Sequence, residues 1–290
     1  MDSMRDTILF GDCRRTLCAF LPKSARMCVT SPPYYGLRDY GGEDNQIGQE
    51  QTPEEYIQQL VEVFREVRNI LTDDGTLWVN IGDSYYNYRP GKAYVKQTVA
   101  SNRQDLPEYS PKRSNKLDGY KEKDLIGIPW MLAFALRSDG WYLRQDIIWN
   151  KPNPMPESVR DRCTKSHEYI FLLSKSQNYY FDVDVIKETT RRKRSVWNIQ
   201  TKPYRGSHFA VYPPELIEPC ILAGSEVGDI VLDPFMGSGT TAAVAKSLGR
   251  DYIGCELHED YGNLIQKRVD EYHPVTEVTH SPILDAINQV

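Results

Sequence analysis

Two turns in the sequence carry residue types that suit chemistry on a nucleotide, and the first is Ser31-Pro32-Pro33-Tyr34. It follows a short apolar run, and its two prolines hold the backbone rigid, so that the carbonyl oxygens keep their direction. A hydroxyl and fixed carbonyls accept hydrogen bonds from an amino group, and an aromatic ring beside them offers a stacking surface for a base. Taken alone, the turn is explained as well by a stiff loop with Tyr34 packed into the core.

The second turn, residues 233–241, reads Asp-Pro-Phe-Met-Gly-Ser-Gly-Thr-Thr and joins a predicted strand to a predicted helix. In a doubly wound sheet such a turn lies at the carboxyl ends of the strands, where ligands bind, and Gly237 and Gly239 let the backbone approach one. No Gly-Lys-Ser/Thr follows and the third glycine of the dinucleotide fingerprint is missing, so neither a P-loop nor a dehydrogenase-like site is favoured. Glu256 ends the next predicted strand and is placed to accept hydrogen bonds from ribose hydroxyls. The alternative for Glu256 is a surface residue that caps the following helix.

The elements that must position these turns alternate between strand and helix. The clearest is a helix that begins at the capping box Thr52-Pro53-Glu54-Glu55 and repeats apolar residues every 3.6 positions or so up to Leu71. This alternation predicts an α/β fold, a doubly wound and mostly parallel sheet with helices on both faces. Predicted strands cover 8–10, 27–30, 76–81, 143–149, 169–173, 179–181, 229–232 and 252–255, with 169–173 and 179–181 as a candidate hairpin; predicted helices cover 53–71, 129–137, 214–223, 239–248 and 259–272.

We expect residues 1–274 to form a single catalytic domain with polar insertions at about 86–124 and 184–207, and residues 275–290 to form a loose tail. The length of 290 residues and the hydrophobic fraction of 40% suit a globular protein. The six cysteines form no CxxC pair and lie near no histidine cluster, which argues against a zinc site or a disulfide framework. No apolar run approaches the roughly 18 residues of a membrane span and the start is no signal peptide, so a cytoplasmic protein is expected.

Charge is distributed unevenly along the chain. The formal net charge is -5, which by itself points away from nucleic acid. Residues 89–123, however, carry +5 and residues 187–205 carry +6, so the remainder of the chain carries -16. An acidic body with two basic segments predicts that contacts with a polyanion are made by those segments, although charge runs are also common in solvated loops.

Together the two turns resemble those of the amino-directed DNA methyltransferases, which use S-adenosylmethionine to methylate the exocyclic amino group of cytosine or adenine. Ser31-Pro32-Pro33-Tyr34 is similar to the family's catalytic tetrapeptide (D/N/S)PP(Y/F/W), and residues 233–240 are similar to its cofactor loop DPFxGSGT. The catalytic turn precedes the cofactor loop, which matches the permuted beta arrangement of these motifs. The resemblance covers roughly 8–35 and 125–270 and implies a Rossmann-like methyltransferase fold.

The resemblance also implies which residues surround the cofactor. Asp12 corresponds to the acidic residue that contacts the adenine, and the segment 208–213 resembles the one that closes over the methionine end. The expected cofactor-binding residues are Phe10, Asp12, His208, Ala210, Tyr212, Pro213, Asp233, Pro234, Phe235, Gly237, Gly239, Thr240, Thr241 and Glu256. No metal site is expected, because the five histidines are spread out.

The activity that the resemblance implies is methyl transfer to the amino group of a flipped base, with Ser31, Pro32, Pro33 and Tyr34 as the catalytic turn. The Ser31 hydroxyl and the Pro32 carbonyl would accept hydrogen bonds from the two N–H groups of the amine. This would localise the lone pair on the nitrogen, ready for attack. Family members with Ser at the first position mostly methylate cytosine N4, so cytosine N4 is favoured and adenine N6 is the alternative. A non-catalytic regulator that binds S-adenosylmethionine or DNA is the alternative from another class.

The basic segments then become candidate DNA-recognition elements, because Lys and Arg contacts to phosphates supply affinity. The expected DNA-contacting residues are Lys112, Arg113, Lys116, Arg191, Arg192, Lys193, Arg194 and Trp197, together with Lys121 and Lys123 at the end of the first segment. Double-stranded DNA is the expected partner, and a cognate restriction endonuclease is a candidate second partner. His167-Glu168 and Asn150-Lys151-Pro152 fall at predicted strand ends, and the sequence assigns them no role.

Overall fold

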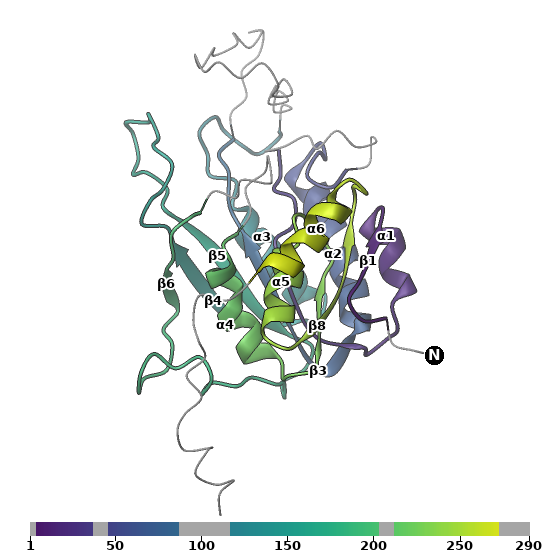
Figure 1. Ribbon diagram of the computed structural model, residues 1–290. Helices are drawn as coiled ribbons and strands as arrows, with labels where there is room; N and C mark the ends of the chain where they lie inside the picture. The colour runs from purple at the N-terminus through teal and green to yellow at the C-terminus, as the bar shows by residue number, and fades with distance from the viewer. Residues whose placement is uncertain (1–3, 37–45, 87–116, 203–211, 273–290) are drawn as a thin grey trace, which may run out of the picture.

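A computed structural model describes residues 4–36, 46–86, 117–202 and 212–272, and over these ranges it contains one sheet of eight strands (Figure 1). The strands are β1 (Thr7–Phe10), β2 (Ala25–Thr30), β3 (Leu71–Ile81), β4 (Tyr142–Asn150), β5 (His167–Ser174), β6 (Val196–Asn198), β7 (Ile230–Asp233) and β8 (Asp251–Glu256). The helices are α1 (Cys13–Thr16), the 3-10 turn η1 (Leu17–Ala19), α2 (Pro53–Ile70), α3 (Ile128–Ser138), α4 (Pro214–Gly224), α5 (Thr240–Ser247) and α6 (Tyr261–Glu271).

The strand order is β1-β8-β7-β2-β3-β5-β4-β6. In the half of the sheet made by β1, β8, β7, β2 and β3, every neighbouring pair is parallel. The carboxyl ends of these five strands therefore meet at one edge of the sheet, which we call the carboxyl edge. β5 is antiparallel to both β3 and β4, and β6 is parallel to β4. The start of β5 and the ends of β4 and β6 therefore reach the same edge. The predicted fold, doubly wound and mostly parallel, is confirmed.

Helices cover both faces of the sheet. In Figure 1, α4, α5 and α6 lie in front of the strands, while α2 and α3 lie behind them. On the rear face Phe64 of α2 and Leu132 of α3 belong to one buried cluster, and on the front face Ile221 of α4 and Val244 of α5 belong to another. A sheet that is apolar on both faces keeps its strands buried, and the polar residues that do chemistry are left to the strand ends.

The sequence signal for α2 is confirmed in detail. The Thr52 hydroxyl accepts from the Glu55 backbone N–H at 3.1 Å, and the Glu55 carboxylate accepts from the Thr52 N–H at 3.2 Å. These bonds satisfy N–H groups that a helix start leaves without partners, and Pro53 fits the first helical position because it has no N–H to satisfy. The helix ends at Ile70 and β3 begins at the next residue, so Asp73, Asp74 and Gly75 lie inside the strand and not between the predicted helix 53–71 and the predicted strand 76–81.

One prediction for the outer half of the sheet is wrong. Residues 179–181 form no strand, and β5 pairs with β3 and β4 instead of closing a hairpin with them. Their apolar character serves packing, because the Phe181 ring stacks on Trp78 with a centroid separation of 6.1 Å. Within the predicted insertion at 184–207, Val196–Asn198 form β6, which extends the sheet beyond β4.

Two features of other protein classes are missing from the part of the chain that the structure describes. Across those ranges no helix has both the length and the apolar character needed to cross a membrane. In the same ranges no group of three or more His, Cys, Asp or Glu side chains is arranged to hold a metal ion.

Candidate active site

The two turns predicted from the sequence meet at the carboxyl edge. β2 leads into Ser31-Pro32-Pro33-Tyr34 and β7 leads into the loop 233–239, and these two strands are neighbours in the sheet. The Thr30 hydroxyl donates to Asp233 Oδ1 at 2.6 Å, and both side chains are fully buried. The residue before the first turn is thus bonded to the first residue of the second.

Asp233 collects donors from three further groups. Its carboxylate accepts from the Phe235 N–H at 3.0 Å, from the Thr241 hydroxyl at 2.5 Å and from the Tyr212 hydroxyl at 3.2 Å. Burial raises the pKa of Asp233, and these hydrogen bonds oppose that rise. With four donors from within the protein, the Asp233 carboxylate holds the loop in shape and joins it to β2. A cofactor would therefore contact the backbone of the loop and not this carboxylate.

Glu256 lies across from that loop at the end of β8. Its Oε2 accepts from the Gly237 N–H at 2.7 Å and its Oε1 accepts from the His258 N–H at 3.0 Å. Burial raises the pKa of the carboxyl group. Gly237 has a φ of +54°, and a Cβ placed there would meet only the Phe235 carbonyl, at 3.9 Å. An acidic group beside open space along a backbone turn suits a ribose and the chain attached to it.

The end of β1 supplies the next part of this edge. Phe10 pairs with Glu256 in the sheet register, and the Gly11 N–H donates to the Glu256 carbonyl at 2.8 Å. Phe10 is 37% exposed, which leaves an apolar surface beside the carboxylate. Asp12 caps α1 and is ion-paired with Arg14 at 2.6 Å; burial acts to raise the pKa of Asp12, but hydrogen bonding to Arg14 holds it below its ordinary value.

The remaining residues expected to hold the cofactor occupy the following places. Pro234 is buried and Phe235 half-buried in the loop, and Pro213 is the buried N-cap of α4. Thr240 begins α5, and its buried hydroxyl has no hydrogen-bond partner within the described ranges. His208 and Ala210 lie outside the described residues. The donor set of acidic, hydroxyl and backbone N–H groups around open space fits the nucleoside and amino-acid parts of S-adenosylmethionine, with Glu256 and the loop 233–239 as the residues that would hold them.

The first turn presents its acceptors beside this loop. Ser31 is half-buried and Pro32 is buried. The Pro33 carbonyl accepts from the Tyr56 hydroxyl of α2 at 2.8 Å, which anchors the turn to the rear helix layer. Among the described residues no hydrogen-bond donor reaches the Pro32 carbonyl. The use of the Ser31 hydroxyl and the Pro32 carbonyl as acceptors for a substrate amine stays a prediction.

Sequence reasoning missed three residues behind the turn, of which Glu168 and Asn80 contact Tyr34 and Lys151 contacts Glu168. The Tyr34 hydroxyl donates to Glu168 Oε2 at 2.7 Å, and Glu168 also accepts from Asn80 Nδ2 at 3.2 Å and pairs with the Lys151 ammonium. Their positions at predicted strand ends were the available signal. It was insufficient because the direction of β5, which brings its first residues to the carboxyl edge, is not readable from a single sequence.

The basic residues predicted to contact DNA are only partly described. Lys112, Arg113 and Lys116 lie outside the described residues. Arg191, Arg192 and Arg194 are exposed, and Lys193 is half-buried with its ammonium over the Trp197 ring at 5.1 Å. This segment precedes β6, whose end and not its start reaches the carboxyl edge.

Trp197 requires a correction. Its side chain is 4% exposed and packs in the front core cluster, and its indole N–H donates to the Arg194 carbonyl at 2.7 Å. No face of the ring is left for a nucleobase, so the residue serves the fold and we remove it from the set of DNA contacts.

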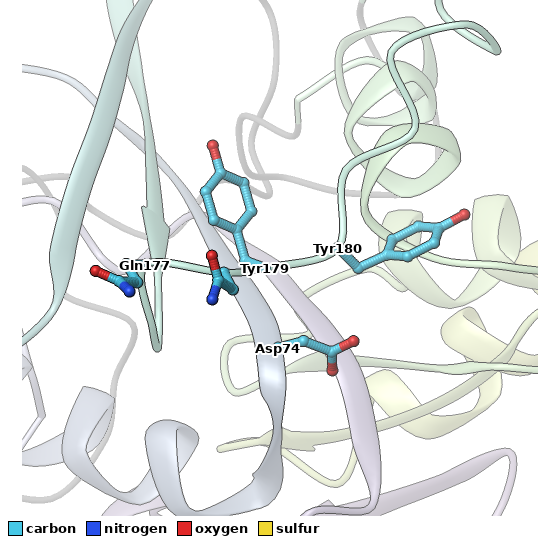
Figure 2. Close-up of a pocket in the computed structure, with 5 residues that line it drawn as sticks. Asp74, Gln177, Tyr179 and Tyr180 are labelled. Carbon is cyan, nitrogen blue, oxygen red and sulfur yellow. The ribbon is translucent and has the colours of Figure 1, made fainter.

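An open hollow on the described surface lies away from these residues. It is at the opposite edge of the sheet, where β3 begins and β5 ends, and Figure 2 shows Tyr179 and Tyr180 pointing apart with the Asp74 carboxylate nearby. The hollow is lined by Asp74, Gln177, Asn178, Tyr179 and Tyr180. Neither turn contributes to it, so it is distinct from the candidate site.

Comparisons with known proteins agree with this geometry. A family model described as DNA methylase matches residues 25–267. The Type II methyltransferase M.Cfr9I of Citrobacter freundii is 50% identical over 273 residues, which cover 91% of this chain and 87% of that protein. The Type II methyltransferase M.SmaI of Serratia marcescens is 51% identical over 269 residues, which cover 90% of each chain.

Two solved structures share the fold. The PvuII DNA methyltransferase (cytosine-N4-specific) superposes with a TM-score of 0.68 at 20% identity, over 99% of this chain and 93% of that one. At this identity the likeness concerns the fold alone. The Thermus thermophilus protein TTHA0409, complexed with S-adenosyl-L-methionine, superposes with a TM-score of 0.64 at 25% identity, over 93% of this chain and 95% of that one.

Proposed function

This chain belongs to the DNA methylase family that comprises the N4 and N6 amino-methyltransferases, and from that premise we propose that it methylates the N4 amino group of cytosine in double-stranded DNA. The observation that carries the proposal is the bond between Thr30 and Asp233, because it places the Ser31 turn against the loop that would hold the methyl donor. A methyl transfer needs its two reactants side by side, and most of its rate enhancement comes from such positioning.

The cofactor is S-adenosylmethionine, which when bound supplies a methyl group on a positively charged sulfur. On the protein side, the Glu256 carboxylate accepts from ribose hydroxyls, and hydrogen bonds to an ionised acceptor are stronger than those between neutral groups. The exposed Phe10 ring offers the adenine an apolar surface next to Glu256. The turn at Gly237 lets the chain of the cofactor pass close to the backbone, because no side chain fills that space.

The Ser31 turn activates the amine. The lone pair of an exocyclic amine is delocalised into the base, so the amine is a weak nucleophile. When the Ser31 hydroxyl and the Pro32 carbonyl accept hydrogen bonds from its two N–H groups, the nitrogen can pyramidalise. Its lone pair then becomes available for attack on the methyl group. The acceptors are held in place beforehand by the prolines and by the bond from Tyr56 to Pro33, so little reorganisation is needed at the moment of reaction.

The base must leave the duplex to reach this turn, and Tyr34 provides the ring on which it stacks. The duplex is gripped through its phosphates by the basic segments, in which Arg191, Arg192 and Arg194 are exposed. The connection between β4 and β5 adds a further basic surface at the carboxyl edge, where Arg160 is exposed and the Arg162 guanidinium stacks over Tyr85 at 3.9 Å.

Cytosine N4 is chosen over adenine N6 because the first residue of the turn is Ser31, the type that resembles the N4 enzymes. The test is to incubate the purified protein with S-adenosylmethionine and DNA, digest the DNA to nucleosides and identify the methylated base by mass spectrometry. N4-methylcytosine is the expected product. N6-methyladenine would overturn the choice of base, and the absence of any methylated base would favour a regulator without catalysis.

The names of the relatives, Type II methyltransferases, support a second part of the proposal. A modification enzyme of this kind works beside a restriction endonuclease that recognises the same DNA sequence. DNA methylated by this protein should then resist one endonuclease of matching specificity. Full cleavage of the methylated site by every endonuclease that reads it would contradict this pairing.

A further inference from the structure

The connection between β4 and β5, residues 151–166, forms a closed loop at the carboxyl edge, next to Tyr34. The Lys151 N–H donates to the Ser166 carbonyl at 2.7 Å, which closes the base of the loop. The Lys151 ammonium pairs with Glu168, and Glu168 Oε2 accepts from the Tyr34 hydroxyl at 2.7 Å. In Figure 1 the loop extends beyond the ends of β4 and β5. A duplex whose flipped base stacks on Tyr34 would therefore come close to this loop.

The loop exposes one large apolar side chain. Met155 is 84% exposed, the highest value among the large hydrophobic residues in the ranges that the structure describes. Val159, four residues further along the same loop, is 42% exposed. A single exposed apolar residue is common on protein surfaces, so exposure alone gives Met155 no role. The way in which the loop holds Met155, and the charges around it, point to one.

The backbone on both sides of Met155 is anchored. Asn153 Nδ2 donates to the Thr201 carbonyl at 3.0 Å, and the Thr201 N–H donates back to Asn153 Oδ1 at 3.0 Å. Two residues after Met155, the Glu157 carboxylate accepts from Arg162 Nη1 at 2.5 Å. The chain that carries the exposed side chain is therefore fixed two residues before it and two residues after it.

Prolines stiffen the stretch between these anchors. Met155 lies between Pro154 and Pro156. Each proline fixes its own φ, and a residue that precedes a proline is held in the extended region, so Met155 has little backbone freedom. Because that freedom is already restricted, a partner that contacts the side chain does not have to order the loop first.

The charges around Met155 suit DNA as the partner. The loop carries four basic side chains, Lys151, Arg160, Arg162 and Lys165, and two acidic ones, Glu157 and Asp161. Both acidic groups already have partners, because Glu157 pairs with Arg162 and Asp161 pairs with the Lys123 ammonium at 2.6 Å. Arg160 is exposed. An apolar side chain within a basic surface matches a duplex, which has an anionic backbone and an apolar stack of bases.

We propose that Met155 enters the duplex beside the flipped base and fills part of the space that the base leaves. The proposal rests on the proposed function, since it needs a base that leaves the stack. Flipping costs the stacking contacts of that base, and an apolar side chain inserted at a base step offsets part of this cost. The unbranched, polarisable Met side chain adapts to such a space. Met155 is thus a positioning residue that stabilises the flipped state and takes no part in the methyl transfer itself.

The test is Met155→Ala, measured by single-turnover methyl transfer at saturating protein and cofactor. The probe is a short duplex that contains a site methylated by the wild-type protein in plasmid DNA. The rate should fall about 10- to 100-fold, which corresponds to the loss of one stacking contact. Met155→Leu keeps an apolar side chain and should retain most of the rate. The Kd for S-adenosylmethionine and the free energy of unfolding should stay at their wild-type values, because Met155 is exposed in the free protein.

A mispaired duplex separates a role in flipping from general damage. A target base that faces a mismatched partner leaves the stack at lower cost, so flipping limits the rate less. The loss of rate in Met155→Ala should therefore be much smaller on the mispaired duplex than on the paired one. Val227→Ala is the matched control, because Val227 is 77% exposed and precedes β7 at the opposite edge of the sheet. It should keep the wild-type rate on both duplexes.

Two outcomes would overturn the proposal. One is a wild-type rate for Met155→Ala on the paired duplex, and the other is an equal loss of rate on the paired and the mispaired duplex. A wild-type protein that methylates no DNA would instead overturn the proposed function.

Discussion

The Thr30 hydroxyl and the Asp233 carboxylate, 2.6 Å apart and fully buried, join the end of β2 to the end of β7. This bond holds the turn that would contact the target amine next to the loop that would hold the methyl donor. Replacement of Thr30 by Val keeps the shape and removes the donor. We expect the free energy of unfolding to fall by about 1–3 kcal/mol, the cost of losing a buried hydrogen bond to a charged group.

The control for Thr30→Val is a second threonine with a buried hydroxyl, near the start of β3. The Thr72 hydroxyl of β3 is buried and has no hydrogen-bond partner within the described ranges. Thr72→Val removes an unsatisfied polar group, so it should be neutral or stabilising in urea-induced unfolding. Equal destabilisation by the two substitutions would contradict the role given to the Thr30 bond.

Replacement of Ser31 by Ala tests the acceptor at the centre of the scheme. Loss of one preorganised hydrogen-bonding group in an active site lowers turnover about 100- to 1000-fold, and we expect a loss of that size here. The Kd for S-adenosylmethionine, measured by calorimetry, should remain near the wild-type value, because the parts that would hold the cofactor are Glu256 and the loop 233–239, and Ser31 belongs to neither. Wild-type turnover in Ser31→Ala would remove amine activation from the mechanism.

The Glu256 carboxylate should make cofactor binding depend on pH. Burial raises its pKa above the ordinary value of 4.5, and ribose hydroxyls bind to the ionised form. Affinity for S-adenosylmethionine should therefore rise with pH through the raised pKa and then level off. Glu256→Gln should weaken binding about 10- to 100-fold and flatten this profile. Glu259→Gln changes an exposed residue nearby and should leave both unchanged.

The Glu256 carboxylate should also make the stability of the protein depend on pH, with a sign opposite to that of its effect on cofactor affinity. Between pH 4.5 and the raised pKa, the folded protein keeps a proton on Glu256 that the unfolded chain has released. The free energy of unfolding of the wild type, relative to Glu256→Gln, should therefore decrease as pH rises through this window. A relative increase over that window, in denaturant titrations without cofactor, would contradict the assignment.

Alanine substitutions at the two glycines of the cofactor loop should affect protein stability and cofactor binding to different extents. Both have positive φ, +54° at Gly237 and +81° at Gly239, so alanine at either position costs about 1 kcal/mol. At Gly239 a Cβ would also lie 2.7 Å from Ile265 Cγ2, which adds an overpacking cost of about 1–3 kcal/mol. Gly239→Ala should therefore unfold at lower denaturant concentration than Gly237→Ala. Gly237→Ala, next to open space, should mainly raise the Kd for S-adenosylmethionine.

The exposed arginines before β6 give a prediction that salt can test. If Arg191 and Arg192 contact phosphates, each substitution by Ala should weaken DNA binding uniformly across sequences and reduce the slope of log K against log salt by about one. Lys267→Ala, on α6 with a side chain 66% exposed, is the control and should leave the slope unchanged. An unchanged slope in the arginine variants would place the DNA elsewhere.

The sequence predicted the features that depend on local pattern. The capping box at Thr52, the alternation of strand and helix and the position of the Gly237 turn all follow from spacing and turn chemistry, and the structure confirms the fold they imply. Residues 179–181 look like a strand because they are aromatic, but tertiary packing against Trp78 explains that character. Trp197 next to four basic residues suggested a DNA contact, whereas its burial depends on β6, a strand too short to leave a periodic signal.

The network behind Tyr34 shows the same limit at the site. Glu168 and Lys151 are separated from Tyr34 by more than a hundred residues, and they meet it only because β5 runs against its neighbours. Strand direction is decided by which faces pack together across the whole sheet, and that information is not local. The roles of the individual site residues remain predictions until the substitutions above are measured.

The reversed direction of β5 has one more outcome. Where parallel strands must be joined by a crossover, β4 and β5 are antiparallel, so residues 151–166 can return directly at the carboxyl edge. This connection lies at the carboxyl edge beside the candidate active site and belongs to neither helical layer. Residues 151–166 could therefore be exchanged between relatives with the sheet and both helical layers left unaltered.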